Sequence, residues 1–240
     1  MEEEKKAKNN DLMEKIVSLC KRRGFIFPGS EIYGGLSGTW DYGPLGTVLL
    51  HNIKEIWWEK FVSDREDMQS VASSIMTPEE VFAASGHLQN FADPLEGQKF
   101  NTMFKSQAGA LKGEVKDFYL RPELAQGMFV NFKNIIDSLS PKLPFGIAQI
   151  GRCFRNEISP RDFLFRVREF DLMEFEYFVR EQDWEKYFEY WRQQIWDWIK
   201  LIGLDESKAH ELEVLPEDRA HYSKRTIDFE YDFPFGKKEL

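Results

Sequence analysis

The sequence feature that most constrains the fold is a hairpin-like stretch over residues 145–178. Its first arm, Phe145–Phe154, is mostly apolar and its second arm, Phe165–Phe178, is rich in aromatic residues, which favours two β-strands. The polar loop between them, Asn156–Leu164, carries a Ser-Pro turn signal. Because side chains alternate along a strand, the second arm gathers cations, a ring and carboxylates on one face. That face holds Arg166, Arg168, Phe170, Leu172, Glu174 and Glu176.

The residues alone leave two interpretations of this face open. A hairpin with a charged face is commonly solvated and binds nothing. Phe170 argues against this first interpretation, because a solvated face does not need an aromatic ring between arginines and glutamates. In the second interpretation the same face clamps phosphate, stacks a base and holds an ammonium group.

The order of these residues also resembles a known motif. Phe154-Arg155-x-Glu157, a loop, then Arg166-xxx-Phe170-xxx-Glu174 is similar to motif 2 of the class II aminoacyl-tRNA synthetases. The longer string GRCFRNEISPRDFLFRVREF resembles the glycyl enzymes of the dimeric, single-polypeptide type, as do IYGGLSGTWDYGPLG, SGHLQNFADP, LRPELAQG and HYSKRTIDFEYDFPFG. The resemblance implies an α+β fold, with a mixed, mainly antiparallel sheet flanked by helices and motif 2 as its central hairpin.

An ATP site on the hairpin follows from the resemblance. Arg155 would bind the α-phosphate and is the expected catalytic residue, and Arg166 would reach the outer phosphates. Glu157 would contact the adenine amino group or hold Arg155 in place, and Phe170 would stack on adenine. The full set implied for ATP is Arg155, Asn156, Glu157, Phe165, Arg166, Val167, Arg168, Glu169 and Phe170. Mg²⁺ is expected on the phosphates of ATP, with no metal ligands from the chain.

The expected amino-acid pocket adds a residue from a separate segment. Glu123 follows a short strand pattern, Phe118–Leu120, and precedes a helix pattern, Ala125–Ile136. By resemblance, Glu123 and Glu174 bind the ammonium group of glycine, with Phe170 beside them. The string LRPELAQG departs from the family's string only at Leu124, where the family has Thr. From the residues alone, a glutamate at a helix N-terminus is favoured by the helix dipole and needs no ligand.

The reaction implied is attack of the glycine carboxylate on the α-phosphate of ATP, giving glycyl-adenylate, followed by transfer to the 3′ end of tRNA(Gly). Such chemistry needs positioning and charge neutralisation more than a nucleophilic side chain. We find no Ser-His-Asp or Cys-His set, and His87 is expected to cap or pack rather than to catalyse. Two alternatives stay open: a paralogue that activates an amino acid for a non-tRNA acceptor, and a non-catalytic ATP-binding or dimerisation module.

Patterns along the chain predict further elements. In chain order they are a helix from Asn9 or Asn10 to about Arg23, a glycine-rich loop at 34–46, a helix over Pro44–Val62, a strand over Met68–Met76, a helix over Gln182–Ile202 and a strand within His221–Gly236. The helix, strand and proline ending at Pro78 resemble motif 1, which implies a homodimer. The aromatic stripe of the 182–202 helix is expected to be core.

We expect residues 1–240 to form one class II catalytic domain, with an N-terminal helix at 1–24. Neither the arginine of the family's third motif nor an anticodon-binding domain is found in the sequence. The chain alone is therefore expected to activate glycine slowly or not at all. Glycine-dependent pyrophosphate exchange near the rate of a full synthetase would contradict this expectation. A longer family insertion after Pro94 is also missing, because Leu95 leads within three residues into KFNTMF.

Composition limits the partners and the compartment. The net charge of −9 is unfavourable for binding nucleic acid, so we expect the tRNA acceptor end to be held either locally or by something absent from this chain. Cys20 and Cys153 match no metal or disulfide pattern. No apolar run reaches the roughly 20 residues of a membrane span, and the charged start is unlike a secretory signal. A cytoplasmic protein is expected.

Overall fold

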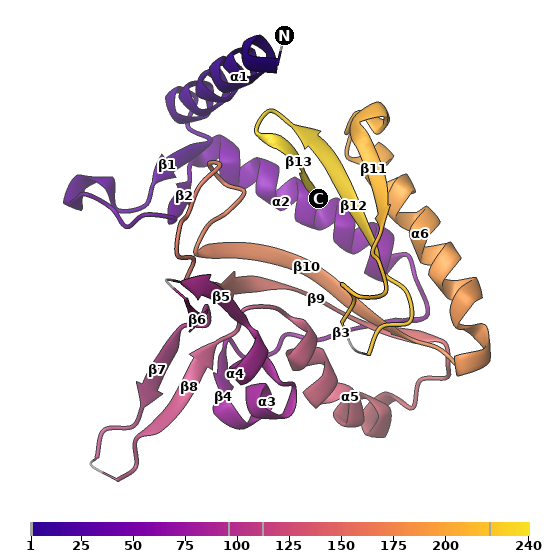
Figure 1. Ribbon diagram of the computed structural model, residues 1–240. Coiled ribbons are helices and arrows are strands. Elements are labelled where there is room, and N and C mark those ends of the chain that lie inside the picture. Colours follow the sequence, from indigo (N-terminus) through magenta and orange to yellow (C-terminus); the bar gives the residue numbers. More distant parts are fainter. Residues whose placement is uncertain (1, 96, 112, 221) are drawn as a thin grey trace. The chain divides into compact units, whose positions relative to one another are not determined.

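The structure, a computed structural model, describes residues 2–95, 97–111, 113–220 and 222–240 (Figure 1). The chain divides into two compact units. One, here called the hairpin unit, consists of residues 24–184; the other, the terminal unit, combines the residues up to 23 with residues 185–240. Every residue expected in the ATP and glycine sites lies in the hairpin unit.

The predicted hairpin is the centre of a three-stranded sheet. β9 (Phe145–Phe154) pairs antiparallel with β10 (Glu169–Phe178) along its whole length, and β3 (Met68–Ser70) runs parallel to β9 on its other edge. The first arm is confirmed residue for residue. The second arm begins four residues later than Phe165, because Arg161 and Arg166 pair across a tight turn whose Asp162 and Phe163 have left-handed φ values of 58° and 60°.

The two faces of this hairpin pack against different helices (Figure 1). On one face, Phe170, Leu172 and Phe178 pack with a buried cluster from α5 (Ala125–Leu139) and β9. On the other, the ring of Phe175 lies 6.2 Å from Trp57 of α2 (Pro44–Trp58). The alternation expected for the second arm is therefore confirmed. Even-numbered residues of β10 face α5, and odd-numbered residues face α2.

The remaining strands of the hairpin unit pair antiparallel. They are β4 (Met76–Pro78), β8 (Lys116–Leu120) and β7 (Lys105–Ala108) in one sheet, β5 (Ala92–Leu95) with β6 (Gln98–Asn101), and β1 (Ile26–Pro28) with β2 (Trp40–Tyr42). Two short helices, α3 (Glu79–Ala84) and α4 (His87–Asn90), follow β4, and a π-helical turn (Glu59–Ser63) continues α2. Among the strands that the structure describes, only β3 and β9 are parallel. The expected mainly antiparallel α+β fold is confirmed.

Two predictions in the N-terminal half need correction. α1 (Glu2–Arg22) encloses Asn9 and Asn10 instead of starting there, because the preceding Glu, Lys and Ala residues are strong helix formers. The strand expected over 68–76 is two strands, β3 and β4. Between them the backbone leaves the sheet, and Ser73 bonds to the buried Gln149 through its N–H and hydroxyl (3.3 and 2.9 Å).

The terminal unit combines helices with an antiparallel sheet of its own. α6 (Trp184–Leu201), whose first residue still belongs to the hairpin unit, follows a 3-10 turn (Glu181–Asp183). A short 3-10 turn (Glu206–Lys208) precedes the strands β11 (Ala209–Glu213), β12 (Ile227–Phe233) and β13 (Gly236–Glu239). Ile199 of the predicted stripe is buried, and Trp196, which was not part of that stripe, meets the ring of Phe229 at 5.7 Å.

The strand prediction at 221–236 is only partly right. The strand starts at Ile227, and His221, the first residue of the predicted segment, lies outside the described residues. β11 went unpredicted because its sequence, AHELE, carries little apolar signal.

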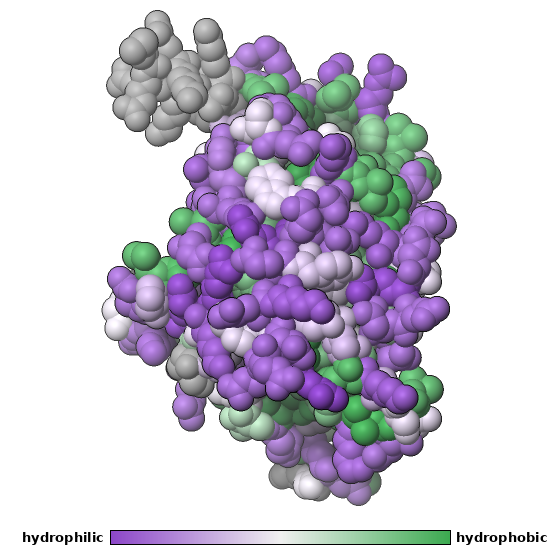
Figure 2. Space-filling view, turned by 90° about the vertical axis from the view of Figure 1, so that its right-hand side faces the viewer, coloured by the Kyte–Doolittle hydropathy of each residue, from purple (hydrophilic) through white to green (hydrophobic). Residues whose placement is uncertain are grey.

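Hydrophilic residues cover most of the face in Figure 2, and hydrophobic ones gather in small groups. None of the helices in the described parts of the chain is long and apolar enough to cross a membrane.

Gly46, in the first turn of α2, provides a test of the packing. A Cβ at this position would lie 1.9 Å from the backbone oxygen of Phe25, which no side-chain rotation can relieve. We expect Gly46→Ala to lower the free energy of unfolding in urea by about 2 kcal/mol, as overpacking does. Asn52→Ala, at an exposed position of the same helix, is the control and should change it by less than about 0.5 kcal/mol. Equal effects of the two substitutions would contradict this packing.

Candidate active site

Arg155 is held between two aromatic rings directly after β9. Its guanidinium carbon lies 5.3 Å from the ring centre of Phe170 and 5.4 Å from that of Phe91. Its Nε donates to the backbone oxygen of Pro122 at 3.1 Å. This one cation therefore joins three segments: the end of α4, the hairpin and the segment before α5. The two aromatic rings and the hydrogen bond to Pro122 orient its guanidinium.

The segment that carries Glu123 is anchored by a buried arginine. Arg121 is 6% exposed and donates to the backbone oxygens of Arg152 (2.9 Å) and Ser73 (2.8 Å). A Cβ at Gly151 would lie 2.2 Å from the Arg121 guanidinium, so the glycine makes room for it. This anchoring sets where Pro122 and Glu123 enter the site.

Two carboxylates flank the start of α5. Glu123 Oε1 accepts from Gln126 Nε2 at 2.6 Å and lies 3.1 Å from His87 Nε2. Glu174 Oε2, from β10, accepts from the backbone N–H of Leu124 at 3.0 Å. The residues expected to bind an ammonium group thus lie on either side of one helix N-terminus.

Three carboxylates, those of Glu123, Glu174 and Glu176, determine the electrostatics of the candidate amino-acid pocket. Burial alone would raise the pKa of Glu123, but hydrogen bonds from His87 and Gln126 outweigh it, and the pKa lies below its ordinary value. Burial raises the pKa of Glu174, with the charge of Glu123 adding to the effect. Burial, then the charges of Glu174 and Glu123, raise the pKa of Glu176 to about 7. A bound cation would relieve this crowding of negative charge.

Glu157 and Arg166 form a pair at the hairpin turn. Glu157 is 9% exposed, and its Oε2 lies 3.0 Å from Arg166 Nε. A second carboxylate, Asp93 of β5, is 3.9 Å from Arg166 Nη2. In this structure Glu157 therefore orients Arg166, while Arg155 is oriented by the rings and by Pro122.

The other residues expected to bind ATP either make contacts within the protein that support the site or lie on another face of the hairpin. Arg168 donates to the backbone oxygens of Ser37 (2.6 Å) and Glu157 (3.0 Å) and so ties the glycine-rich loop to the hairpin. Glu169 lies on the α2 face, 3.5 Å from Arg152. Asn156 donates its backbone N–H to Thr102, Val167 is buried and Phe165 is exposed.

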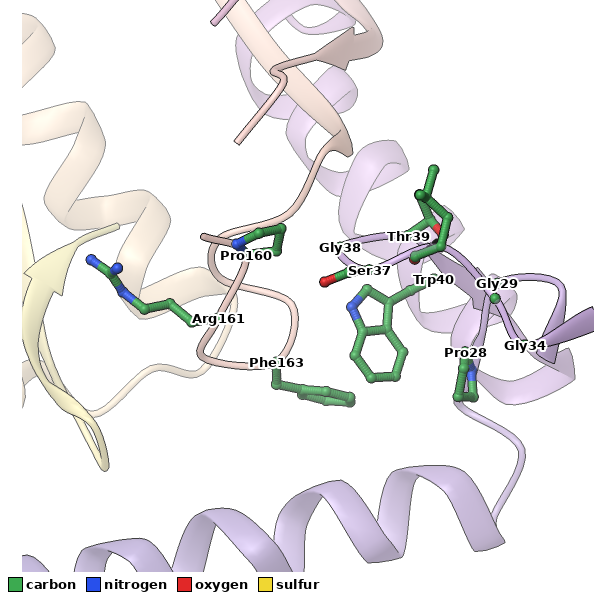
Figure 3. A pocket seen from close by; sticks show the side chains of 12 residues that line it. Pro28, Gly29, Gly34, Ser37, Gly38, Thr39, Trp40, Pro160, Arg161 and Phe163 are labelled. Carbon is green, nitrogen blue, oxygen red and sulfur yellow. Dashed lines mark hydrogen bonds between the residues drawn. The ribbon is translucent and has the colours of Figure 1, made fainter. Parts of the chain in front are cut away.

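The glycine-rich loop and the hairpin turn line an open pocket of about 270 Å³ (Figure 3). The rings of Trp40 and Phe163 meet in it edge to face at 5.0 Å, whereas Arg161 points away from Trp40. Gly38 has a φ of +77°, and a Cβ there would lie 2.7 Å from Pro160. The loop therefore packs closely on the turn of the hairpin, beside the residues of the expected ATP site.

The family of the chain follows from a comparison with known proteins. A family model described as "tRNA synthetase class II core domain (G, H, P, S and T)" matches residues 104–239. This stretch is more than half of the 240 residues and includes Glu123 and the whole hairpin. The chain belongs to the class II tRNA synthetases.

Several curated relatives that resemble the chain are named glycine–tRNA ligase. The protein from Caldanaerobacter subterraneus subsp. tengcongensis is 40% identical over 285 residues, covering 95% of this chain and 62% of the relative. That of Thermus thermophilus is 39% identical over 95% of this chain and 60% of the relative, and that of Geobacillus thermodenitrificans 40% over 95% and 61%. The resemblance stated from the sequence is confirmed. The chain spans about three fifths of the length of these relatives.

This class II synthetase is also shorter than its relatives inside the matched stretch. Since 95% of 240 residues is about 228, the 285 aligned positions include about 57 at which the Caldanaerobacter protein has residues and this chain has none. β5 and β6 pair as far as Leu95 and Gln98, leaving only residues 96 and 97 between them. The longer insertion expected after Pro94 would fit at this turn.

Sequence reasoning missed three members of the class II synthetase's site. His87 was expected only to cap or pack, yet its Nε2 reaches Glu123. Phe91 and Gln126 were not singled out, although one stacks on Arg155 and the other donates to Glu123. Gln126 lies one helical turn after Glu123 and could have been found by that spacing. No local pattern connects His87 with Glu123, which are 36 residues apart.

Glu176 gives a pH-dependent prediction. Because its folded pKa of about 7 lies above the unfolded value near 4.5, the folded chain keeps a proton that the unfolded chain loses between those pH values. Stability should therefore fall as pH rises through this window and level off above it. Glu176→Gln, which has the shape of the neutral acid, should stabilise the fold at pH 8 by up to about 3 kcal/mol and leave it unchanged near pH 4.5.

Urea denaturation at both pH values measures this effect. Glu55→Gln removes the same charge from a side chain that is 67% exposed and is the control. It should shift the free energy of unfolding by less than about 0.5 kcal/mol at either pH. A Glu176→Gln variant that differs from the wild type equally at both pH values would show that this carboxyl does not titrate in the window.

Proposed function

We propose that the chain carries the glycine-activating site of a glycine–tRNA ligase. It would convert glycine and ATP to glycyl-adenylate and pyrophosphate and pass the glycyl group to the 3′ end of tRNA(Gly). The observation that carries the proposal is the position of Arg155 between Phe91 and Phe170, with its charge acting on both Glu123 and Glu174. The name shared by the relatives supports it.

The amino-acid half of the proposed site is the carboxylate pair. Glu123 and Glu174 accept hydrogen bonds and present negative charge beside the N-terminus of α5. An ammonium group between them would offset their mutual repulsion and the cost of burying them. A pocket that fills the space beyond the α-carbon excludes larger amino acids more readily than it distinguishes smaller ones.

The nucleotide half of the proposed site consists of Arg155, Arg166 and the ring of Phe170. A guanidinium fork matches phosphate oxygens, so Arg155 suits the α-phosphate and Arg166 the outer phosphates. Since Arg155 covers a face of Phe170 in this structure, ATP would draw the guanidinium toward its phosphate and place adenine over the ring. Mg²⁺ would enter on the phosphates, whose oxygens suit it. No three His, Cys, Asp or Glu side chains among the described residues are grouped to hold a metal ion.

In the proposed reaction a carboxylate oxygen of glycine attacks the α-phosphorus, and the bond to pyrophosphate breaks. A hydroxyl of the terminal adenosine of tRNA then attacks the glycyl carbonyl, and AMP leaves. The side chains position both substrates and neutralise the charge on the phosphate, which is most of what phosphoryl transfer requires. No nucleophilic side chain is needed.

We further propose that the two units belong to one catalytic domain and that the chain forms a homodimer through α2 and β3, which correspond to motif 1. Leu45, Val48 and Leu49 of α2 are each about half exposed, which gives the helix an apolar surface for a second copy. Analytical ultracentrifugation tests the dimer: a single monomeric species at micromolar concentration would contradict it.

Charging assays test the proposed function. Labelled glycine should become attached to tRNA(Gly) and not to other tRNAs. The net charge of −9 favours a second candidate, transfer of the activated amino acid to a non-tRNA acceptor such as a phosphopantetheine carrier. Label on the carrier but not on tRNA would select this candidate. Because the chain alone is expected to activate glycine slowly or not at all, label on neither acceptor would favour a non-catalytic nucleotide-binding module only if calorimetry also shows no binding of glycine.

A further inference from the structure

We propose that His87 is a positioning residue for both halves of the site: its ring edge orients Glu123, and its ring face supports the stack that holds Arg155. The inference rests on the proposed function. No local sequence pattern places His87 near either substrate.

The edge of the ring connects two side chains. Nε2 lies 3.1 Å from Glu123 Oε1, and Nδ1 lies 2.9 Å from Ser85 Oγ. A carboxylate oxygen only accepts, so Nε2 carries the proton toward Glu123. In the neutral ring Nδ1 then accepts from the Ser85 hydroxyl, which fixes the tautomer and the ring orientation. Glu123 thus receives one donor from His87 and one from Gln126 at the same oxygen, Oε1.

The face of the ring belongs to an aromatic row. It stacks on Phe91 with the ring centres 5.3 Å apart and the planes 21° apart. The fully buried Phe82 lies 5.7 Å away and fixes the histidine from the protein interior. Phe91 in turn lies against Arg155, which lies against Phe170. The row Phe82, His87, Phe91, Arg155 and Phe170 therefore leads from the core to the proposed adenine site.

The backbone around His87 makes this placement rigid. Its carbonyl oxygen accepts from Asn101 Nδ2 at 3.3 Å and from the N–H of Phe91 at 3.0 Å. Its side chain is only 15% exposed. A residue here must supply both a hydrogen-bond donor at its tip and a flat ring. A packing histidine would need only the ring, and this difference makes the two roles separable.

Two substitutions separate the roles. His87→Phe keeps a ring and loses the donor, whereas His87→Gln keeps a donor and loses the ring. By calorimetry on the full chain, His87→Phe should raise the Kd of glycine about tenfold and leave that of MgATP within about twofold, since a hydrogen bond to a charged group is lost. His87→Gln should do the reverse and raise the Kd of MgATP about fivefold through the loosened cation–π stack.

A double-substitution cycle adds a measurement that would stay unchanged if His87 served only in packing. On a Glu123→Gln background, His87→Phe should add less than about twofold to the Kd of glycine, because the carboxylate it orients is gone. The matched controls are His210→Phe and His210→Gln, at a histidine 3.0 Å from Asp232 Oδ2 that is not part of this site. Both should leave both Kd values unchanged.

The outcomes distinguish the inference from the proposed function. A wild-type chain that binds neither glycine nor MgATP overturns the proposed function, and the inference with it. A wild-type chain that binds both, with His87→Phe and His87→Gln shifting the two Kd values alike or not at all, overturns the inference alone. If circular dichroism shows either variant unfolded, Ser85→Ala, at an exposed position, tests the same contact. It should raise the Kd of glycine about threefold, and no change would overturn the inference.

Discussion

Arg155→Ala is expected to weaken MgATP binding at least about 100-fold, because charge-assisted, forked contacts to phosphate are among the strongest hydrogen bonds in proteins. The arginine follows β9 directly and lies between Phe91 and Phe170, with a side-chain hydrogen bond to Pro122 that orients the guanidinium. Neither of the buried clusters described around Leu124 and Phe82 contains Arg155, so the fold should persist. Calorimetry measures the affinity, and circular dichroism checks the fold.

The matched control for this prediction is Arg180→Ala, at an exposed arginine that follows β10. It removes the same charge from the chain and should change the Kd of MgATP by less than about twofold, since exposed charges are screened. Arg155→Lys keeps the charge but loses the planar fork, and its affinity should fall between the wild type and alanine. An unchanged affinity in Arg155→Ala would refute the assignment of this residue.

Glu123→Gln should weaken glycine binding about 30-fold or more and leave the Kd of MgATP within about threefold, because one member of the carboxylate pair loses its charge while keeping its shape. Its Oε1 already accepts from Gln126 and lies near His87. Those contacts position the side chain but do not replace a negative charge facing an ammonium group. Separate titrations of glycine and MgATP measure the two effects.

Glu80→Gln is the control for the glutamate, since Glu80 is exposed on α3 in the same unit. It should leave both affinities unchanged. Equal losses of glycine and MgATP affinity in Glu123→Gln would point to a disturbed fold, and no loss of glycine affinity would remove Glu123 from the pocket.

Local patterns were enough to predict β9 and α5, two of the elements that carry the site, but not α4. The apolar run of β9 and the helix after Glu123 both have the predicted period and lie where predicted. The turn between the hairpin arms was set too short, because the left-handed Asp162 and Phe163 have no glycine-like signal in the sequence. β11 was missed since three of its five residues are polar.

The contacts within the site depend on distant segments, which a single sequence does not connect. Arg168 belonged to the expected ATP set, yet its Nη1 donates to Ser37, 131 residues away. His87 contacts Glu123, 36 residues away, and Phe91 lies against Arg155, which is also distant in the sequence. The resemblance to the class II synthetases indicated which residues to consider, and the structure shows how four of them, Arg155, Phe170, Glu123 and Glu174, gather around the N-terminus of α5.

The most direct measurement is a calorimetric titration of the chain with a non-hydrolysable glycyl-adenylate analogue, which joins the glycine ammonium and the nucleotide in one molecule. We predict one site per chain, tighter than for glycine or MgATP alone because both halves bind together. Arg155→Ala and Glu123→Gln should each lower the affinity for the analogue without abolishing it. No binding by the wild-type chain, or binding that neither substitution changes, would contradict a glycine-activating site on this hairpin.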